Sequence, residues 1–155
     1  MYFTAQYGHF EKRPNLKFGQ KLKYGDVIGV MGTSGQSKWP HLHLHVIRDF
    51  HRHITRLRDI YPKGLYIPAK RQLKFFADKD LFGVRLVQTT PYNSKKYREA
   101  YGKPHYALDL VPFDRHTTNA HFTVRWNRSF TGTVLDIGFD KYGYGYYAVI
   151  GYDTE

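Results

Sequence analysis

Residues 40–46 read PHLHLHV, a segment in which histidine alternates with leucine or valine. This alternation restricts the local structure more than any other feature of the sequence. Successive side chains of a β-strand point to opposite faces. The pattern therefore predicts a strand with an apolar face toward a core and a second face that carries His41, His43 and His45. Two of these imidazoles can serve one metal ion. A half-buried strand with histidines on its solvent face fits the pattern equally well.

Most of the 155-residue chain has the composition of β-strands. Tyrosine, phenylalanine, valine and threonine alternate with glycine-rich turns, and few segments carry an apolar stripe at helical spacing. We therefore predict a mainly β fold in one domain, residues 1–155. Residues 1–47 and 81–155 form its core, and the basic segment 48–80 is a connector with one short helix near residues 50–60. The expected strands are residues 2–7, 26–31, 41–47, 84–88, 106–111, 121–126, 132–137 and 146–152.

Composition excludes several classes of site. The chain has no cysteine, which rules out disulfide scaffolds, thiolate metal sites and cysteine nucleophiles, so any metal is held by nitrogen and oxygen. A formal net charge of +11 favours anionic partners such as nucleic acid, anionic lipid or a cell-wall polymer. No apolar run approaches the roughly 18 residues of a membrane span, and residues 1–10 lack the apolar centre of a secretory signal. We expect a soluble chain with no membrane partner and no export signal of its own.

A second candidate metal-binding segment is HYALD at residues 105–109. His105 and Asp109 are four residues apart, so on a strand they share a face and can bind one ion with an imidazole and a carboxylate. An ordinary polar face would look the same. Together with a histidine of residues 41–45, the pair offers two nitrogens and one oxygen and leaves a fourth position for water, as in a catalytic zinc site.

Several ordered motifs resemble those of the lysostaphin-type (LytM-like) zinc endopeptidases. They are distributed along the chain from residue 6 to residue 150: QYGHF at 6–10, FGQKL at 18–22, GDVIG at 25–29, GTSGQS at 32–37, PHLH at 40–43, HYALD at 105–109, TGTV at 131–134 and YGYGYYAVI at 142–150. The resemblance implies an antiparallel β-sheet domain of the duplicated-hybrid-motif type that cuts peptide bonds in bacterial peptidoglycan. It also implies a zinc ion (Zn2+) held by His43, His105 and Asp109. His9 and His41 would be the catalytic residues that bind the activated water or stabilise the tetrahedral intermediate.

The order of the segments departs from this family. The His-x-x-x-Asp segment ordinarily comes first and the His-x-His strand last, whereas here residues 40–43 precede residues 105–109. Joining the two chain ends restores the usual order, which resembles a circular permutation with the cut in a hairpin turn. We therefore expect residues 2–7 to pair antiparallel with residues 146–152, with Met1 and Glu155 close together.

Three positions differ from the family pattern. Ala107 and Trp39 stand where glycine is common, and His45 stands where an acidic residue is common. We expect His45 to lie at the open end of its strand rather than to transfer protons. Two interpretations of Trp39 stay open, a substrate subsite formed by its flat ring or a cover for the edge of the core. We expect a solvated surface for the remaining histidines and the main basic residues: His51, His53, His116, His121, Arg52, Arg56, Arg58, Lys95, Lys96 and Arg98.

These observations leave three functional hypotheses. The leading one is a zinc-dependent peptidoglycan endopeptidase, extracellular or virion-associated, whose partners are stem or cross-bridge peptides, anionic wall polymers and other phage tail proteins. The second is a non-catalytic member of the same fold that binds the wall or regulates. The presence of all five expected histidine and aspartate positions argues against it. The third is a basic nucleic-acid-binding β domain, which explains the charge but not the histidine spacing.

Overall fold

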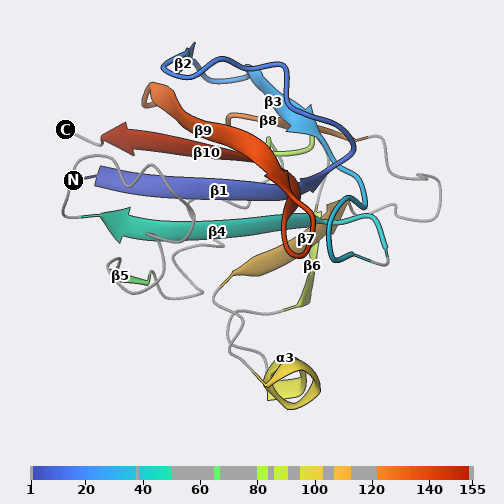
Figure 1. Cartoon of the computed structure of the whole chain (residues 1–155). Helices are drawn as coiled ribbons and strands as arrows, with labels where there is room; N and C mark the ends of the chain where they lie inside the picture. Colours follow the sequence, from blue (N-terminus) through green and yellow to red (C-terminus); the bar gives the residue numbers. More distant parts are fainter. Residues whose placement is uncertain are drawn as a thin grey trace.

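The computed structural model describes residues 2–37, 39–49, 65–66, 80–83, 86–90, 95–102, 107–112 and 122–153. Its strands form one large sheet in the order β2-β9-β10-β1-β4-β7-β6, with β5 beside β4, and a second sheet of β3 and β8 (Figure 1). The strands are β1 (Tyr2–Phe10), β2 (Lys21–Leu22), β3 (Val27–Val30), β4 (Leu42–Asp49), β5 (Leu65–Tyr66), β6 (Leu86–Thr90), β7 (Leu108–Pro112), β8 (Thr123–Arg125), β9 (Gly132–Asp140) and β10 (Gly145–Asp153). The described pairings are antiparallel, so the predicted mainly β, antiparallel fold is confirmed.

Each predicted strand overlaps an observed one, with ends that differ by a few residues. The two short strands β2 and β5 were not predicted, because two residues are too few to show an alternation. β5 belongs to the segment expected to be a connector, and it pairs with Ile47 and Arg48 of β4. The helix expected near residues 50–60 lies outside the described residues.

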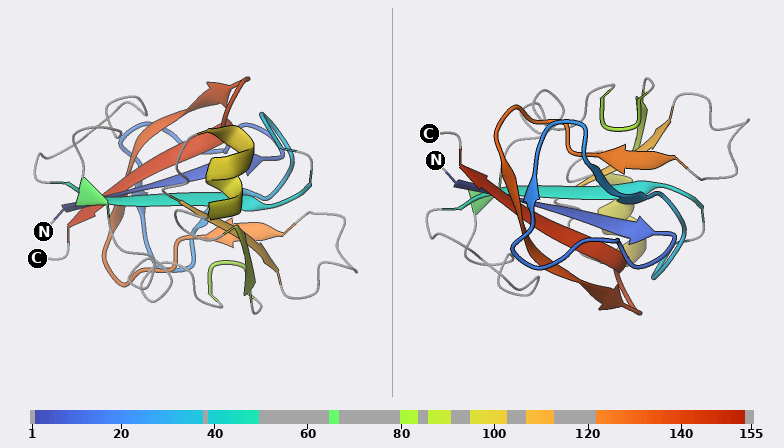
Figure 2. Two further views of the ribbon diagram at one scale, coloured as in Figure 1. Left: turned by 90° about the horizontal axis from the view of Figure 1, so that it is seen from below. Right: turned by 90° about the horizontal axis from the view of Figure 1, so that it is seen from above.

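A short helix that no sequence pattern indicated, α3 (Lys95–Tyr101), lies beyond the β6 and β7 edge of the large sheet (Figures 1 and 2). None of its residues is buried, so it has no apolar stripe to reveal it. Lys95 and Glu99 form an ion pair of 3.9 Å along its surface. Gly102 ends it with a φ of +68° and an N–H that donates to the Arg98 carbonyl at 2.9 Å. The described residues contain no helix that is long and apolar enough to span a membrane.

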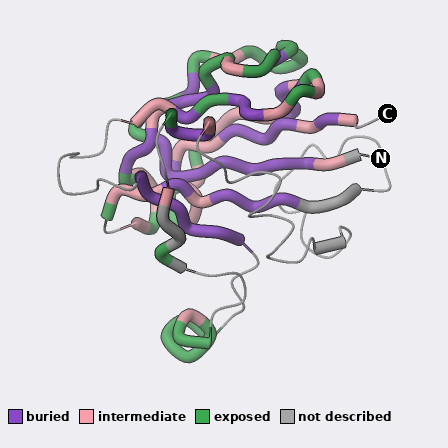
Figure 3. Tube along the Cα trace, turned by 180° about the vertical axis from the view of Figure 1, so that it is seen from behind, coloured by how far each residue is buried: buried purple, intermediate pink, exposed green. Residues whose placement is uncertain are grey.

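The apolar face of β4 lies in the core as predicted. Leu42, Leu44 and Val46 are fully buried and alternate with the histidines. Figure 3 shows that buried residues follow the central strands β10, β1 and β4. Trp126 packs in the same core, and its indole Nε1 donates a hydrogen bond of 2.8 Å to the Phe130 carbonyl. The core therefore anchors the strands from one side, and the histidines of β4 project from the other.

The expected pairing between the first and last strands is confirmed. β1 runs antiparallel to β10, from Tyr2 opposite Asp153 to Phe10 opposite Tyr146. The start of β1 and the end of β10 lie side by side in all views of Figures 1 and 2. Met1 and Glu155 themselves lie outside the described residues.

Candidate active site

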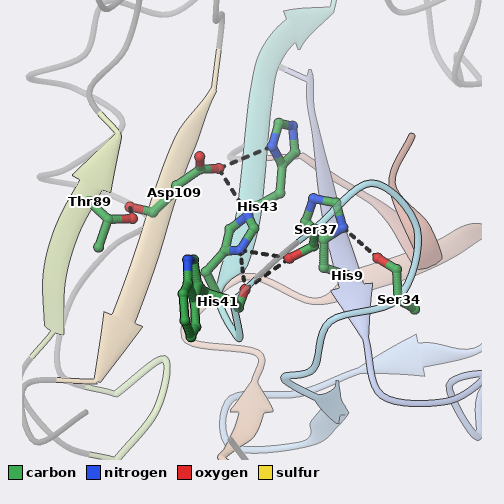
Figure 4. Close-up of polar contacts among 8 residues, drawn as sticks. His9, Ser34, Ser37, His41, His43, Thr89 and Asp109 are labelled. Carbon is green, nitrogen blue, oxygen red and sulfur yellow. Dashed lines mark hydrogen bonds and ion pairs between the residues drawn. The ribbon is translucent and has the colours of Figure 1, made fainter. Parts of the chain in front are cut away.

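Three neighbouring strands place a glycine, a histidine and an aspartate in one row across the sheet. His43 of β4 lies opposite Gly8 of β1 on one side and opposite Asp109 of β7 on the other. Directly opposed residues of an antiparallel sheet point to the same face, so the carboxylate of Asp109 meets the imidazole of His43. The distance from His43 Nδ1 to Asp109 Oδ1 is 3.2 Å (Figure 4). The register of β4 and β7 therefore brings together two of the residues assigned to the metal.

A β-bulge redirects His9. The pairing of β1 with β10 shifts between Tyr7 and Phe10, and His9 has a φ of +64°. Regular alternation would turn His9 into the core after Tyr7, but Phe10 takes that place and is fully buried. The centroid of the His9 ring lies instead 4.6 Å from that of His41 and 5.8 Å from that of His43. A left-handed backbone is uncommon for a residue with a side chain, and such conformations cluster at functional sites.

Backbone carbonyls from one loop fix the tautomers of His9 and His41. His9 Nδ1 lies 2.7 Å from the carbonyl oxygen of Ser34, and His41 Nδ1 lies 2.8 Å from that of Trp39. A carbonyl oxygen only accepts hydrogen bonds, so both Nδ1 atoms carry the hydrogen. In the neutral imidazole this leaves the lone pair on Nε2. His41 Nε2 lies 3.6 Å from Asp109 Oδ1, which orients this nitrogen toward the row of His43 and Asp109.

The loop that supplies these carbonyls is fastened to both neighbouring strands. The hydroxyl of Ser34 donates to the carbonyl of Phe10 on β1 and accepts a hydrogen bond of 2.9 Å from the N–H of Tyr146 on β10. Gly35 has a φ of +75°, and a Cβ added there would lie 2.2 Å from the backbone nitrogen of Gly145. Only glycine fits this contact. The Ser34 carbonyl is thus held at a defined place beside His9.

A serine outside the predicted site residues supports His41. The Ser37 hydroxyl donates to the Trp39 carbonyl at 2.8 Å and lies 3.2 Å from His41 Nδ1. The same carbonyl therefore accepts from Ser37 and from His41. The motif GTSGQS at residues 32–37 contained the signal, because loop serines commonly bond to nearby backbone groups, but a sequence pattern does not name their partners.

Tyr144 is a further neighbour of the site. Its ring centroid lies 5.0 Å from that of His43, and its carbonyl accepts a hydrogen bond of 2.6 Å from the N–H of His9. A Cβ added at Gly8 would lie 3.2 Å from the Tyr144 Cβ, so the absence of a side chain at Gly8 makes room for the tyrosine. The glycine-rich hairpin at residues 142–150 thus packs against the histidines.

Burial sets the charge of His9. Burial, with the neighbouring His41 as the next cause, lowers the pKa of His9 from 6.5 to about 4. His9 is therefore neutral near pH 7 and can accept a proton at Nε2. The side chains of His41 and His43 are 18% and 12% exposed, so solvent reaches the site.

The expectation that His45 lies at the open end of its strand was wrong. β4 continues to Asp49, so His45 is an interior residue of the strand and only 1% exposed. It lies opposite Gln6 of β1, on the same face as His43. Gln6 is fully buried, and its amide makes no hydrogen bond within the part of the chain that the structure describes.

The third residue assigned to the metal, His105, lies outside the described residues, as do His51, His53, His116 and His121. Within residues that the structure describes, no three histidine, aspartate or glutamate side chains form a group that could hold a metal ion. The 3.2 Å between His43 Nδ1 and Asp109 Oδ1 nevertheless fits zinc. Two ligands of a tetrahedral zinc with bonds of about 2.0 to 2.1 Å lie about 3.3 Å apart.

An antiparallel β domain with histidines and an aspartate gathered on one sheet face has the donor types of a metallopeptidase site. The family model for peptidase family M23 matches residues 2–55. The match covers about a third of the chain and includes His9, His41 and His43, whereas Asp109 lies beyond it. It supports a LytM-like member of this family and suggests metallopeptidase activity on the cell wall. No solved structure matches the chain.

Proposed function

We propose that the protein is a zinc-dependent endopeptidase that hydrolyses peptide bonds in bacterial peptidoglycan. The observation that carries this proposal is the meeting of four side chains on one face of the sheet: His9 of β1, His41 immediately before β4, His43 of β4 and Asp109 of β7. Three of the four lie within the segment that matches a peptidase family. The rings of His41 and His43 each place a nitrogen within 3.6 Å of Asp109 Oδ1, and the ring of His9 lies against both of them.

His43 and Asp109 would hold the ion, with His105 as the third ligand in this proposal. A bound zinc ion supplies Lewis-acid chemistry, the activation of water and the polarisation of a carbonyl. An imidazole and a carboxylate are donors that zinc accepts, and the 3.2 Å between His43 Nδ1 and Asp109 Oδ1 suits binding to one centre.

His9 and His41 would move protons and stabilise charge. Each donates its Nδ1 hydrogen to a backbone carbonyl, so each keeps Nε2 for the reaction. A neutral Nε2 accepts a proton as a general base, and the resulting N–H can then donate to the leaving amine or to the oxyanion of a tetrahedral intermediate. The low pKa of His9 keeps it in the accepting form near pH 7.

The segment order supports a further part of the proposal, a circular permutation relative to the LytM-like arrangement. The antiparallel pairing of β1 with β10 is the arrangement that a permutation with its cut in the turn between these strands would leave. We place the protein outside the cell or on a virion, where peptidoglycan is accessible, and the charge of +11 would raise its residence near anionic wall polymers.

The test is mass spectrometry of fragments released from purified cell walls of different cross-bridge types by the zinc-loaded protein. New amino and carboxyl ends at one peptide bond are expected, and a chelator should abolish them. Walls left intact by a protein that binds one zinc per chain would instead support a non-catalytic wall-binding role. The absence of metal binding together with salt-sensitive binding to oligonucleotides would support the nucleic-acid hypothesis.

A further inference from the structure

Trp39 is an exposed aromatic residue next to the candidate catalytic His41. Trp39 is 78% exposed, whereas the other tryptophan, Trp126, is fully buried. Trp39 therefore does not cover the edge of the core, which was one of its two interpretations. Isolated exposed apolar residues are common on protein surfaces, so exposure alone assigns no role.

The backbone of Trp39 is held in place. Its carbonyl accepts hydrogen bonds of 2.8 Å from the Ser37 hydroxyl and 2.8 Å from His41 Nδ1. Pro40 follows, and a residue before proline is restricted to extended conformations. The bonds that orient His41 thus also fix the point from which the indole extends. A side chain on a pre-organised backbone loses less entropy when it binds a ligand.

We propose that the indole of Trp39 forms a subsite for a sugar ring of the glycan strand, beside the position of the scissile peptide. This inference rests on the proposed function, in which the substrate joins glycan and peptide. A pyranose ring has a flat apolar C–H face that can cover an indole while its hydroxyl groups stay in water at the rim. A cationic peptide group is the weaker candidate for the same ring, because a protein of net charge +11 repels it.

The two tryptophans make binding directly measurable by fluorescence. Iodide or acrylamide should quench Trp39 and leave the buried Trp126 unaffected. Peptide-free oligomers of N-acetylglucosamine and N-acetylmuramic acid should reduce the quenchable fraction in the full-length chain. The Trp39→Ala variant should lose the response, and Phe18→Ala should keep it. Phe18 is 75% exposed on the segment between β1 and β2, so it controls for the loss of an exposed aromatic ring.

A kinetic measurement separates this subsite from the endopeptidase proposal. Trp39→Ala should lower the ratio of kcat/KM for intact wall to kcat/KM for a short cross-bridge peptide by about three- to tenfold, the usual worth of one stacking contact. Phe18→Ala should leave the ratio unchanged. Equal losses on both substrates, no shielding by the glycan oligomers, or shielding only by an oligonucleotide would each overturn the subsite. If the parent protein cleaves neither substrate, the endopeptidase proposal fails, while the quenching experiment still decides the subsite.

Discussion

The site has two halves in which histidine has different partners. The strand half is His43 with Asp109, and the loop half is His9 and His41 with the loop before β4. In the strand half, His43 meets a side-chain carboxylate, that of Asp109, from the adjacent strand. In the loop half, His9 and His41 bond to the backbone carbonyls of Ser34 and Trp39. A carboxylate adds a negative charge that favours a cation, whereas a carbonyl mainly fixes the tautomer of the ring. Under the proposed function, this contrast favours metal binding for the first half and proton transfer for the second.

The largest expected effect is on the strand half. Asp109→Ala should lose zinc and wall hydrolysis together, with activity falling to background, because removal of a ligand removes the centre itself. Zinc per chain and the rate of wall clearing are the two measurements. Glu99→Ala, which removes an exposed carboxylate on α3, should change neither. Zinc retained at one per chain in Asp109→Ala would show that this carboxylate is not a ligand.

Alanine substitutions of the loop-half histidines should reduce activity without removing the metal. His9→Ala or His41→Ala should reduce wall hydrolysis by roughly 10² to 10⁴ while zinc stays near one per chain, because each removes a proton-transfer or oxyanion-stabilising group. His41 deserves the closer test, since its Nε2 lies only 3.6 Å from Asp109 Oδ1. If His41→Ala loses zinc and His43→Ala keeps it, the two histidines exchange roles. Parental activity in both the His9 and the His41 variant would contradict the assignment.

The strand half was more accessible to sequence reasoning than the loop half. The alternation in residues 40–46 predicted the β4 faces correctly, because side-chain direction in a strand follows a period of two. The same rule misplaces His9, since a bulge at this position breaks the period and only the three-dimensional pairing of β1 with β10 reveals it. The family resemblance named His9, and the structure supplied the reason that its ring reaches the site.

Contacts between segments far apart in the chain could not be predicted from the sequence. The bonds of Ser34 to β1 and β10 join residues far apart in the chain, and no local pattern encodes them. The helix α3 was not predicted for a different reason. None of its residues is buried, so it lacks the apolar stripe by which a helix is recognised in a sequence. His45 was misjudged because burial of a strand position depends on what covers the sheet, which alternation does not state.

A smaller effect on kcat is expected in the loop half, from the serine that supports His41. Ser37→Ala should lower kcat by about two- to tenfold, the worth of one hydrogen bond that holds the Trp39 carbonyl and, through it, His41. Zinc content should not change. Ser37→Thr keeps a hydroxyl at the same position and should restore much of the rate. Loss of zinc in Ser37→Ala, or no recovery with threonine, would mean that the serine supports the fold rather than the orientation of His41.

The smallest expected effect is on the pH dependence of stability, and it comes from a tyrosine bonded to a carboxylate away from the site. On β10 and β9, the Tyr147 hydroxyl donates to Asp136 Oδ2 at 3.1 Å. Burial, with the charge of Asp136 as the next cause, raises the pKa of Tyr147 from 10 to about 12. The folded chain thus keeps this proton above pH 10, where the unfolded chain releases it. The free energy of unfolding should therefore decrease from pH 10 to pH 12, and Tyr147→Phe should make that decrease shallower. Urea titrations at several pH values measure the difference between the parent and the variant. Identical pH profiles would show that the protonation of Tyr147 is not coupled to folding.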